Sequence, residues 1–318
     1  MKRILVVGAG GQIGTELVPH LQKLYGKDNV IGADLKDLQV EKLREGGIGE
    51  KLDATDANAF ADLVKKYKVD SIFNLVALLS ATGEKMPELA WKLNMGALLN
   101  SLNIAKEFKC SVFTPSSIGA FGSSTPHYKT PQDTVMRPNT IYGVCKVAGE
   151  LLSDYYFTRF GVDTRSVRFP GIISNGAQPG GGTTDYAVEV FYEIIKDGHH
   201  YTCEVPQDSY MDMMYMPDAL KAVTDLMEAD PARLIHRNSF NIASMSFCPK
   251  ELFEAIKKRI PDASFDYDID PVKAAISASW PDIMDDSCAR EEWGWKPEWG
   301  MEAVVDDMLA AVRKKSVK

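Results

Sequence analysis

The chain is poor in cysteine, and the cysteines that it has do not cluster. There are five of them, an odd number, spread along the sequence with no C-x-x-C pair. Structural zinc sites need closely spaced cysteine or histidine ligands, and secreted domains held by disulfides need paired cysteines. The sequence therefore predicts no metal site and a reducing compartment, which we expect to be the cytoplasm.

Long apolar runs and basic runs are also missing. No segment reaches the roughly 20 apolar residues that a membrane-spanning helix requires. The first apolar run, ILVV, is short and glycines follow it closely, so we expect no signal peptide. The chain carries 36 Lys and Arg against 44 Asp and Glu, a formal charge of -8, without basic tracts. Membranes and nucleic acids are therefore not expected partners.

Up to about residue 170, the sequence contains a regular alternation of short apolar runs with longer amphipathic ones. This alternation is typical of βαβ units and a parallel sheet. Helical patterns cover residues 14–26 and 88–108. Strands are predicted at residues 3–7, 30–34, 71–76, 111–115 and 164–169.

A glycine-rich turn joins the first predicted strand to the first predicted helix. Gly8, Gly11 and Gly14 have G-x-x-G-x-x-G spacing there. Glycines let the backbone turn tightly and approach a pyrophosphate, whose charge meets the free N–H groups at the helix N-terminus. A glycine motif alone is weak evidence, but a strand before it and a helix after it make it more specific. The turn therefore predicts a dinucleotide cofactor.

An acidic residue ends the second predicted strand. Asp34 follows Gly14 by 20 residues, where a carboxylate accepts hydrogen bonds from both adenosine ribose hydroxyls and repels a 2′-phosphate. This position favours NAD over NADP, although Lys36 lies nearby and Asp34 has the alternative role of an ordinary turn residue. Asp53, in KLDATD, has the same two interpretations, with adenine contact as the functional one.

These patterns together predict an α/β fold with a Rossmann-type doubly wound parallel sheet and a smaller C-terminal α/β substrate lobe. Beyond residue 169 the alternation loosens into Gly, Pro and Thr, followed by short helical patterns and isolated strands. We expect the NAD-binding domain at residues 1–170, with about 205–235 returning to it. The substrate lobe is expected mainly at residues 171–204 and 236–318.

Tyr142 and Lys146 lie four residues apart in NTIYGVCKVAGELL, so that both side chains point to one face of a predicted helix. A phenol is a poor base at neutral pH, but an ammonium group one turn away favours the phenolate. The pair can then take a proton from an alcohol while a hydride leaves the same carbon. The spacing alone is common, and an amphipathic helix with a surface lysine is the alternative.

The upstream segment FTPSSIGAFG supports the catalytic interpretation. It follows a predicted strand and offers Ser116 and Ser117 as hydrogen-bond donors. Either hydroxyl could instead bond to the backbone at the end of the strand.

Over nearly its whole length, the chain resembles the extended short-chain dehydrogenase/reductase superfamily. The resemblance includes the glycine loop, the acidic strand end, Asn94 in KLNMGALLN, the Ser-Tyr-Lys set and the C-terminal GWKPEWGMEAVVDDM. It implies that Ser117, rather than Ser116, is the catalytic serine, and that Lys146 also bonds the nicotinamide ribose.

The same resemblance implies further contacts with NAD. Leu75 and Ala77 would pack on the cofactor, and the backbone near Ile172 would meet the carboxamide. The expected cofactor contacts are Gly8, Gly11, Gln12, Ile13, Gly14, Asp34, Leu35, Asp53, Ala54, Leu75, Ala77, Asn94, Tyr142, Lys146 and Ile172.

Most extended members act on nucleotide sugars, and they grip the diphosphate with an arginine in an R-D-Y-I-H-V-D-D-type segment. The matching MDMMYMPDA has Met211 at that position, and RFPGIISNG lacks the asparagine of their F-N-x-x-G-like run. A diphosphate without its cation loses a charge-assisted contact worth about 1.5–3 kcal/mol. The sequence therefore predicts a smaller substrate.

The segments at those places are similar to the short-chain type of L-threonine 3-dehydrogenase. The similarity lies in PSSIGAFG, RFPGIIS, PGGGTTDYAVEVFY, MMYMPDA and SWPDIMDDSCAREEWGW, which span residues 115–295. It implies oxidation of the β-hydroxyl of L-threonine by NAD, giving L-2-amino-3-oxobutanoate and NADH. The unrelated zinc-dependent threonine dehydrogenases need clustered ligands, which this chain lacks.

A substrate site is expected in the loop GGGTTDY, which leads into a predicted helix. Its free N–H groups and the hydroxyl of Thr183 or Thr184 would hold a carboxylate without a buried cation. Alternatively, Thr184 or Asp185 only caps the helix. The resemblance favours substrate contact, with Thr184 as the better candidate. The expected substrate contacts are Ser80, Ser117, Tyr142, Gly182, Thr183 and Thr184.

Two further residues have open roles. Ser80 bonds the substrate amine or carboxylate, or it is an ordinary loop serine. Trp280, in SWP, closes over the site or packs in the small lobe, and packing is the expected role of an isolated tryptophan.

Two alternatives to the threonine dehydrogenase function stay open, and the resemblance also implies an oligomeric state. The rivals are a nucleotide-sugar epimerase or dehydratase and a catalytically silent NAD-binding protein, and the intact Ser-Tyr-Lys set argues against the second. Members of the superfamily often dimerise through two long helices, here about residues 87–107 and 139–160. We therefore expect a homodimer that binds L-threonine as its small-molecule partner.

Overall fold

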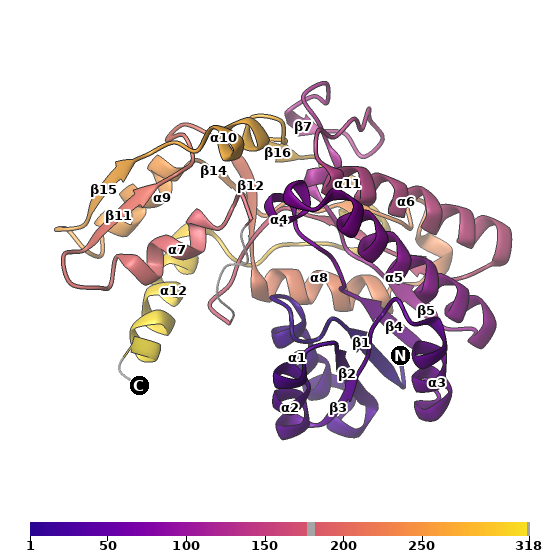
Figure 1. Ribbon diagram of the computed structural model, residues 1–318. Coiled ribbons are helices and arrows are strands. Elements are labelled where there is room, and N and C mark those ends of the chain that lie inside the picture. Colours follow the sequence, from indigo (N-terminus) through magenta and orange to yellow (C-terminus); the bar gives the residue numbers. More distant parts are fainter. Residues whose placement is uncertain (177–181, 317–318) are drawn as a thin grey trace.

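The computed structural model describes residues 1–176 and 182–316, and a six-stranded sheet forms its centre (Figure 1). Every pair of neighbouring strands in this sheet runs parallel. The order across it is β3 (Ile48–Lys51), β2 (Val30–Asp34), β1 (Ile4–Val7), β4 (Ser71–Asn74), β5 (Ser111–Phe113) and β8 (Thr164–Arg165).

Helices cover both faces of the sheet. They are α1 (Gly14–Tyr25), α2 (Asp37–Gly46), α3 (Ala57–Tyr67), α4 (Ser80–Lys85), α5 (Pro87–Phe108), α6 (Ile141–Phe160) and α8 (Met216–Glu228). Leu5 and Val7 of β1 pack in one hydrophobic cluster with α3 and α5, whereas Ile4 and Val6 pack in another with α1 and α8. A strand buried on both faces needs a continuous apolar run, which ILVV supplies. The predicted Rossmann-type doubly wound fold is confirmed.

The observed strands differ from the predicted ones mainly at their ends. The predicted strand 164–169 divides at Ser166, whose N–H donates to the carbonyl of Arg237, so that β8 stays in the central sheet and the next strand leaves it. Strand β3 was not predicted, because IGEK at the sheet edge contains two charged residues in four and lacks an apolar run.

Two three-stranded sheets carry the chain from the central sheet to the smaller lobe. The first consists of the parallel strands β13 (Phe240–Asn241), β9 (Val167–Phe169) and β6 (Ser116–Ser117). The second consists of β10 (Gly171–Ile173), β12 (Met211–Tyr215) and β14 (Met245–Phe247). Strands β6 and β9 begin directly after β5 and β8, and residues of β6, β9 and β10 line the site described below.

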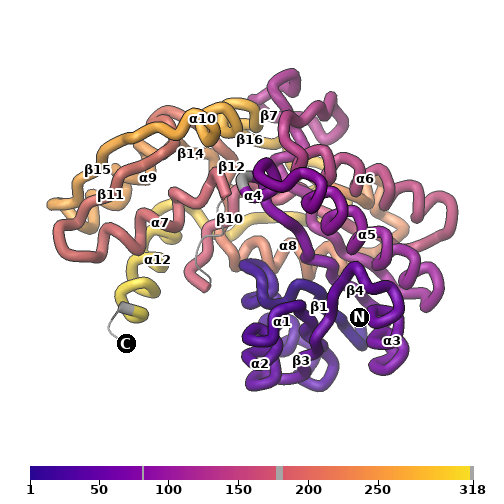
Figure 2. Tube along the Cα trace, in the orientation of Figure 1, coloured from indigo at the N-terminus to yellow at the C-terminus, as the bar shows by residue number. Residues whose placement is uncertain are grey.

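The smaller lobe has a core of its own, in which α12 packs against α7 and α9 (Figure 2). Its aromatic centre includes Phe253, which stacks on Phe265 with 4.3 Å between ring centroids. The remaining elements are β7 (Tyr128–Thr130), α7 (Tyr186–Glu193), β11 (His200–Cys203), α9 (Pro249–Lys257), β15 (Ser264–Tyr267), α10 (Pro271–Ser277), β16 (Ile283–Met284), α11 (Ser287–Trp293) and α12 (Met301–Ser316).

The segment from 205 to 235 contacts both parts of the molecule. Helix α8 packs in the same cluster as α1 and β1, whereas β12 pairs with β10 and β14. The division into an NAD-binding domain and a substrate lobe stays a prediction. Within the two described ranges, no helix is both long and apolar enough to cross a membrane.

Candidate functional site

The loops that follow β1, β2 and β4 surround an open cavity of about 800 Å³. In a parallel sheet the carboxyl ends of the strands share one edge, where ligands of doubly wound folds bind. Eight residues of the predicted cofactor set line this cavity: Gly8, Gly11, Asp34, Leu35, Asp53, Ala54, Leu75 and Ala77.

The glycine loop has the geometry that a pyrophosphate requires. Gly8 has a φ of 80°, which residues with a side chain rarely adopt. A Cβ atom on Gly14 would lie 2.6 Å from the carbonyl oxygens of Gly8 and Ala9, so only glycine lets the helix approach the strand this closely. Ile13 caps α1 without a side-chain acceptor, and the N–H groups of Thr15 and Glu16 already donate to the carbonyls of Gly11 and Ile13, so an anion meets the helix at the N–H groups before Thr15. The loop therefore fits a dinucleotide phosphate.

The carboxylate of Asp34 holds the glycine loop against the end of β2. One oxygen accepts the N–H of Gly10 at 2.9 Å, and the other accepts the N–H of Lys36 at 3.1 Å. Asp53 lines the same cavity but already accepts two hydrogen bonds from Thr55, which lower the pKa of its carboxyl group. Both acids thus lie where the sequence predicts the adenosine to bind. Each also accepts hydrogen bonds from nearby residues of its own loop or of the glycine loop.

A second open cavity, of about 820 Å³, shares Leu75 and Ala77 with the first. It extends from the start of α1 to the smaller lobe and collects most of the remaining predicted residues. These are Gln12, Ile13, Ser80, Ser117, Tyr142, Lys146, Ile172, Gly182, Thr183 and Thr184. The structure therefore brings the expected cofactor and substrate contacts together in two adjoining cavities.

Tyr142 and Lys146 project from the first turns of α6. Thr140 caps this helix, because its hydroxyl accepts the N–H of Gly143 at 3.0 Å. The Nζ atom of Lys146 lies 5.2 Å from the centre of the Tyr142 ring and donates to the carbonyl of Pro115 at 2.6 Å. The ammonium group is thus near the phenol and tied to the strand segment that carries the two serines.

The structure distinguishes the two candidate serines by their hydrogen bonds. The hydroxyl of Ser116 donates to the buried carboxylate of Glu150. The hydroxyl of Ser117 only accepts, from the N–H of Gly119 at 3.1 Å, so its own proton is available to a ligand in the cavity. This difference favours Ser117, as the family resemblance does.

The loop between β10 and α7 enters the second cavity through residues 182–185; Gly180 and Gly181 lie outside the described residues. Thr183 is 2% exposed, and its hydroxyl has no hydrogen-bond partner within the described parts of the chain. The carboxylate of Asp185 accepts the N–H of Gly182 at 2.7 Å and does not cap α7. The loop therefore presents a buried hydroxyl and a carboxylate to the cavity.

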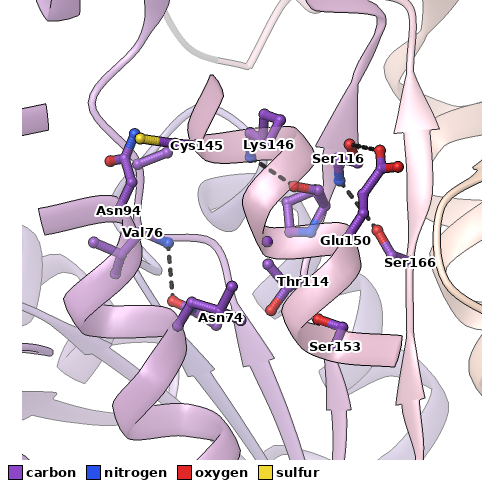
Figure 3. Close-up of a pocket in the computed structure, with 14 residues that line it drawn as sticks. Asn74, Val76, Asn94, Thr114, Ser116, Cys145, Lys146, Glu150, Ser153 and Ser166 are labelled. Atoms are coloured by element: carbon purple, nitrogen blue, oxygen red, sulfur yellow. Dashed lines mark hydrogen bonds between the residues drawn. The ribbon is translucent and has the colours of Figure 1, made fainter. Parts of the chain in front are cut away.

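Asn94 lines neither of these two cavities. It lines a third, smaller cavity (Figure 3), which it shares with the predicted cofactor contacts Ala77 and Lys146. Its side chain accepts from the N–H of Leu78 at 2.7 Å and donates to the carbonyl of the same residue at 3.2 Å. Asn94 thus fixes the backbone that follows β4.

The sequence interpretation missed some residues of the site. Asp185 was considered only as a helix cap, yet it lines the second cavity. Trp280 packs in the core of the smaller lobe, as expected, and it also lines that cavity. Glu150 was not considered, although it lies one helical turn beyond Lys146. The signal that could have identified it is a carboxylate four residues beyond Lys146, on the same face of the predicted helix.

One cluster of metal-ligand residues lies away from both cavities and consists of His236, Cys288 and Glu292. Glu292 pairs with the His236 ring and also accepts the backbone N–H groups of Ile235 and His236. These contacts account for the cluster as part of the packing of α11.

The model of the NAD-dependent epimerase/dehydratase family matches residues 4–243. A relative from Staphylococcus aureus (strain MRSA252), named an uncharacterized epimerase/dehydratase, is 51% identical over 315 residues, which cover 99% of this chain and 98% of the relative.

Two solved structures are similar over almost the full length. One is L-threonine dehydrogenase from Clostridium difficile, with 52% identity, a TM-score of 0.97, and coverage of 100% of this chain and 99% of that one. The other is the holo form of a GalE-like L-threonine dehydrogenase from Cupriavidus necator, with 46% identity, a TM-score of 0.91, and coverage of 97% and 99%. These similarities confirm the family resemblance and NAD as the cofactor.

We expect Asp34→Ala to weaken NAD binding about ten- to hundredfold, because it removes an acceptor of charge-assisted hydrogen bonds. It should also relax the preference for NAD over NADP. Fluorescence titration with NADH and NADPH measures both effects. Asp37→Ala is the matched control, since Asp37 is exposed and pairs with Lys51 on the surface. An unaltered NAD to NADP ratio in Asp34→Ala would contradict the assignment.

Proposed function

Because this chain belongs to the NAD-dependent epimerase/dehydratase family and is an NAD-dependent oxidoreductase, we propose that it oxidises L-threonine. The β-hydroxyl group becomes a ketone, and the product is L-2-amino-3-oxobutanoate. NAD supplies the acceptor for the hydride that leaves the β-carbon, and NADH is the second product.

The observation that carries the proposal is the composition of the second cavity. It joins the Tyr142–Lys146 pair to the buried hydroxyl of Thr183, and Lys146 is the one basic side chain among the described residues that line it. A nucleotide diphosphate needs more positive charge than this, because each charge-assisted contact to it is worth about 1.5–3 kcal/mol. A small zwitterion that carries an alcohol has no such need. Met211 is buried in β12 and lines neither cavity.

In the proposed reaction, Tyr142 acts as a phenolate and takes the proton of the β-hydroxyl. The Lys146 ammonium stabilises the phenolate charge, and its bond to the Pro115 carbonyl holds it near the ring. Ser117 donates a hydrogen bond to the reacting oxygen and thereby orients it. These roles follow from the geometry of α6 and β6 and from general acid–base chemistry.

The loop 182–185 holds the amino-acid part of the substrate in this proposal. The hydroxyl of Thr183 has no other partner in the described chain, so we now favour Thr183 over Thr184 as the donor to the substrate carboxylate. The methyl group of Thr184 lies close to Gly171, where an added Cβ would approach it to 2.6 Å. Asp185 offers a carboxylate to the ammonium group, and Ser80, 5% exposed, faces the same cavity.

Substrate specificity tests the whole proposal. The protein is mixed with NAD and, separately, with L-threonine, L-serine, D-threonine or UDP-glucose, and NADH absorbance is followed. Net NADH from L-threonine is the expected result. Conversion of UDP-glucose without net NADH would instead support a sugar epimerase, and no turnover with any substrate would support a silent NAD-binding protein.

Tyr142→Phe tests the base. Since a positioned acid or base contributes about 10²–10⁴ to the rate, kcat should fall by that factor, while NADH affinity stays close to that of the wild type. Tyr128→Phe is the control, because it removes a phenol that is exposed and lines neither cavity. If Tyr142→Phe kept most of its turnover, another group would have to be the base.

Thr183→Val tests the substrate contact and has an unusual second readout. Losing a donor to a carboxylate should raise the KM for threonine roughly ten- to hundredfold. The thermal midpoint of the free protein should stay the same or rise, because a buried hydroxyl without a partner destabilises the fold. Thr183→Ser keeps the hydroxyl and should stay close to wild type in KM. A larger KM effect of Thr184→Val would return the contact to Thr184.

We also propose that the protein is a homodimer that pairs α5 and α6 of two copies. The two helices lie side by side (Figure 1), and both expose apolar side chains, including Trp91 and Leu99 on α5 and Leu151 and Tyr155 on α6. Exposed apolar patches of this kind mark association surfaces.

We also propose a cytoplasmic location, with which the free cysteines, four of them buried, accord.

Leu151→Arg should convert the dimer to a monomer, because it places a charge in the centre of that surface. Sedimentation velocity measures the change in mass. Leu38→Arg alters an equally exposed leucine on α2 and should leave the mass unaltered. A wild-type protein that sediments as a monomer would refute the dimer.

A further inference from the structure

The hydroxyl of Ser116, next to the serine assigned to the reaction, is committed to a buried network. Ser116 is 5% exposed, and its side chain donates to Glu150, which is 6% exposed (Figure 3). Its backbone N–H donates to the hydroxyl of Ser166 at 3.2 Å. The residue immediately before Ser117 is therefore held through both its side chain and its backbone.

Glu150 belongs to the same helical face as the reactive pair. Tyr142, Lys146 and Glu150 follow one another at intervals of four residues along α6, so they lie on adjacent turns of one side of the helix. Lys146 donates to the carbonyl of Pro115, and Glu150 accepts from Ser116. Two successive turns of α6 thus hold two successive residues of the segment that leads to Ser117.

The other side of Glu150 is fixed by Arg168 on β9. The guanidinium donates to both carboxylate oxygens, from Nε at 3.0 Å and from Nη2 at 2.8 Å. Its Nη1 donates to the carbonyl of Gln132 at 2.8 Å and to the side chain of Asn241 at 2.9 Å. Arg168 is also the direct register partner of Ser116 in the parallel pairing of β6 and β9. The network therefore joins α6, β6, β9 and β13 at one point.

A gain in folding stability does not by itself explain the buried Glu150–Arg168 pair. A buried ion pair often contributes no more than apolar residues of the same volume would, because desolvation of both charges offsets their attraction. A bidentate pair does supply fixed geometry, since the planar guanidinium and the carboxylate constrain each other's orientation. What the pair fixes here is the position of Ser116, and through one peptide unit that of Ser117.

We propose that Glu150 and Ser116 are positioning residues that set the Ser117 hydroxyl relative to the Tyr142 oxygen. The inference rests on the proposed threonine dehydrogenase function and extends it to a layer of residues that need not touch the substrate. Reacting groups must be held within a fraction of an ångström, and a displacement of about 1 Å can reduce a rate about 100-fold. Ser116 also lines the second cavity, but its hydroxyl is committed to Glu150, so it acts on the reaction through Ser117.

A double-mutant cycle with Ser116→Ala, Ser117→Ala and the double variant tests this dependence. Ser116→Ala leaves the Glu150–Arg168 pair intact and breaks only the link to β6. We expect its kcat to fall about 10- to 100-fold, with NADH affinity close to that of the wild type. The thermal midpoint should fall, as it does for loss of any hydrogen bond to a buried charged group. In the Ser117→Ala background, the same change should have almost no further effect on kcat, because the group that it positions is already absent.

The control is Ser101→Ala, which removes another fully buried serine hydroxyl, one that donates to the carbonyl of Ala97 on the same helix. Its kcat should match that of the wild type. Wild-type kcat in Ser116→Ala, or fold-losses that multiply in the double variant, would overturn the inference while leaving the proposed function standing. A wild-type protein that makes no NADH from L-threonine would overturn the proposed function itself, and the inference with it.

Discussion

The parallel pairing of β1 with β2 and β4 is the constraint on which the rest of the structure depends. Val7, the last residue of β1, is in register with Ala33 on one side and with Asn74 on the other. Three loops from distant parts of the sequence therefore leave the sheet at one edge, and the cofactor cavity forms between them. The apolar strands make this edge rigid, since both faces of β1 are buried. Only the residues just beyond the strand ends are left to contact a ligand.

The reactive side chains depend on a second alignment, between α6 and the segment that continues from β5. The helix presents one face to residues 115–117, and two hydrogen bonds join them: Lys146 donates to a carbonyl, and Glu150 accepts from a hydroxyl. Such contacts are directional, whereas apolar packing tolerates small shifts. Polar contacts at this interface are therefore suited to holding a proton acceptor and a hydroxyl donor at a set separation.

The substrate end of the second cavity has a buried hydroxyl without a bonded acceptor among the described residues, and little positive charge. Among the described residues, the buried hydroxyl of Thr183 has no hydrogen-bond partner, which lowers the stability of the free protein until a ligand supplies the acceptor. Together with a cavity in which Lys146 is the one basic side chain among the described lining residues, this favours a small carboxylate over a diphosphate.

The sequence by itself determined the Rossmann-type sheet, the glycine loop and the Tyr142–Lys146 pair, because each depends on spacing within a single strand, turn or helix. It also indicated the family, since several such segments fit one known pattern. Only the tertiary structure decided which hydroxyls are free and which are committed. Ser116 and Ser117 are indistinguishable neighbours in the sequence, and what separates them is Glu150, 34 residues from Ser116, which accepts from Ser116 and not from Ser117. Asn94 likewise fits the family pattern, but only the structure shows that its amide bonds both the N–H and the carbonyl of Leu78. Such partnerships arise where distant segments meet, and no local spacing encodes them.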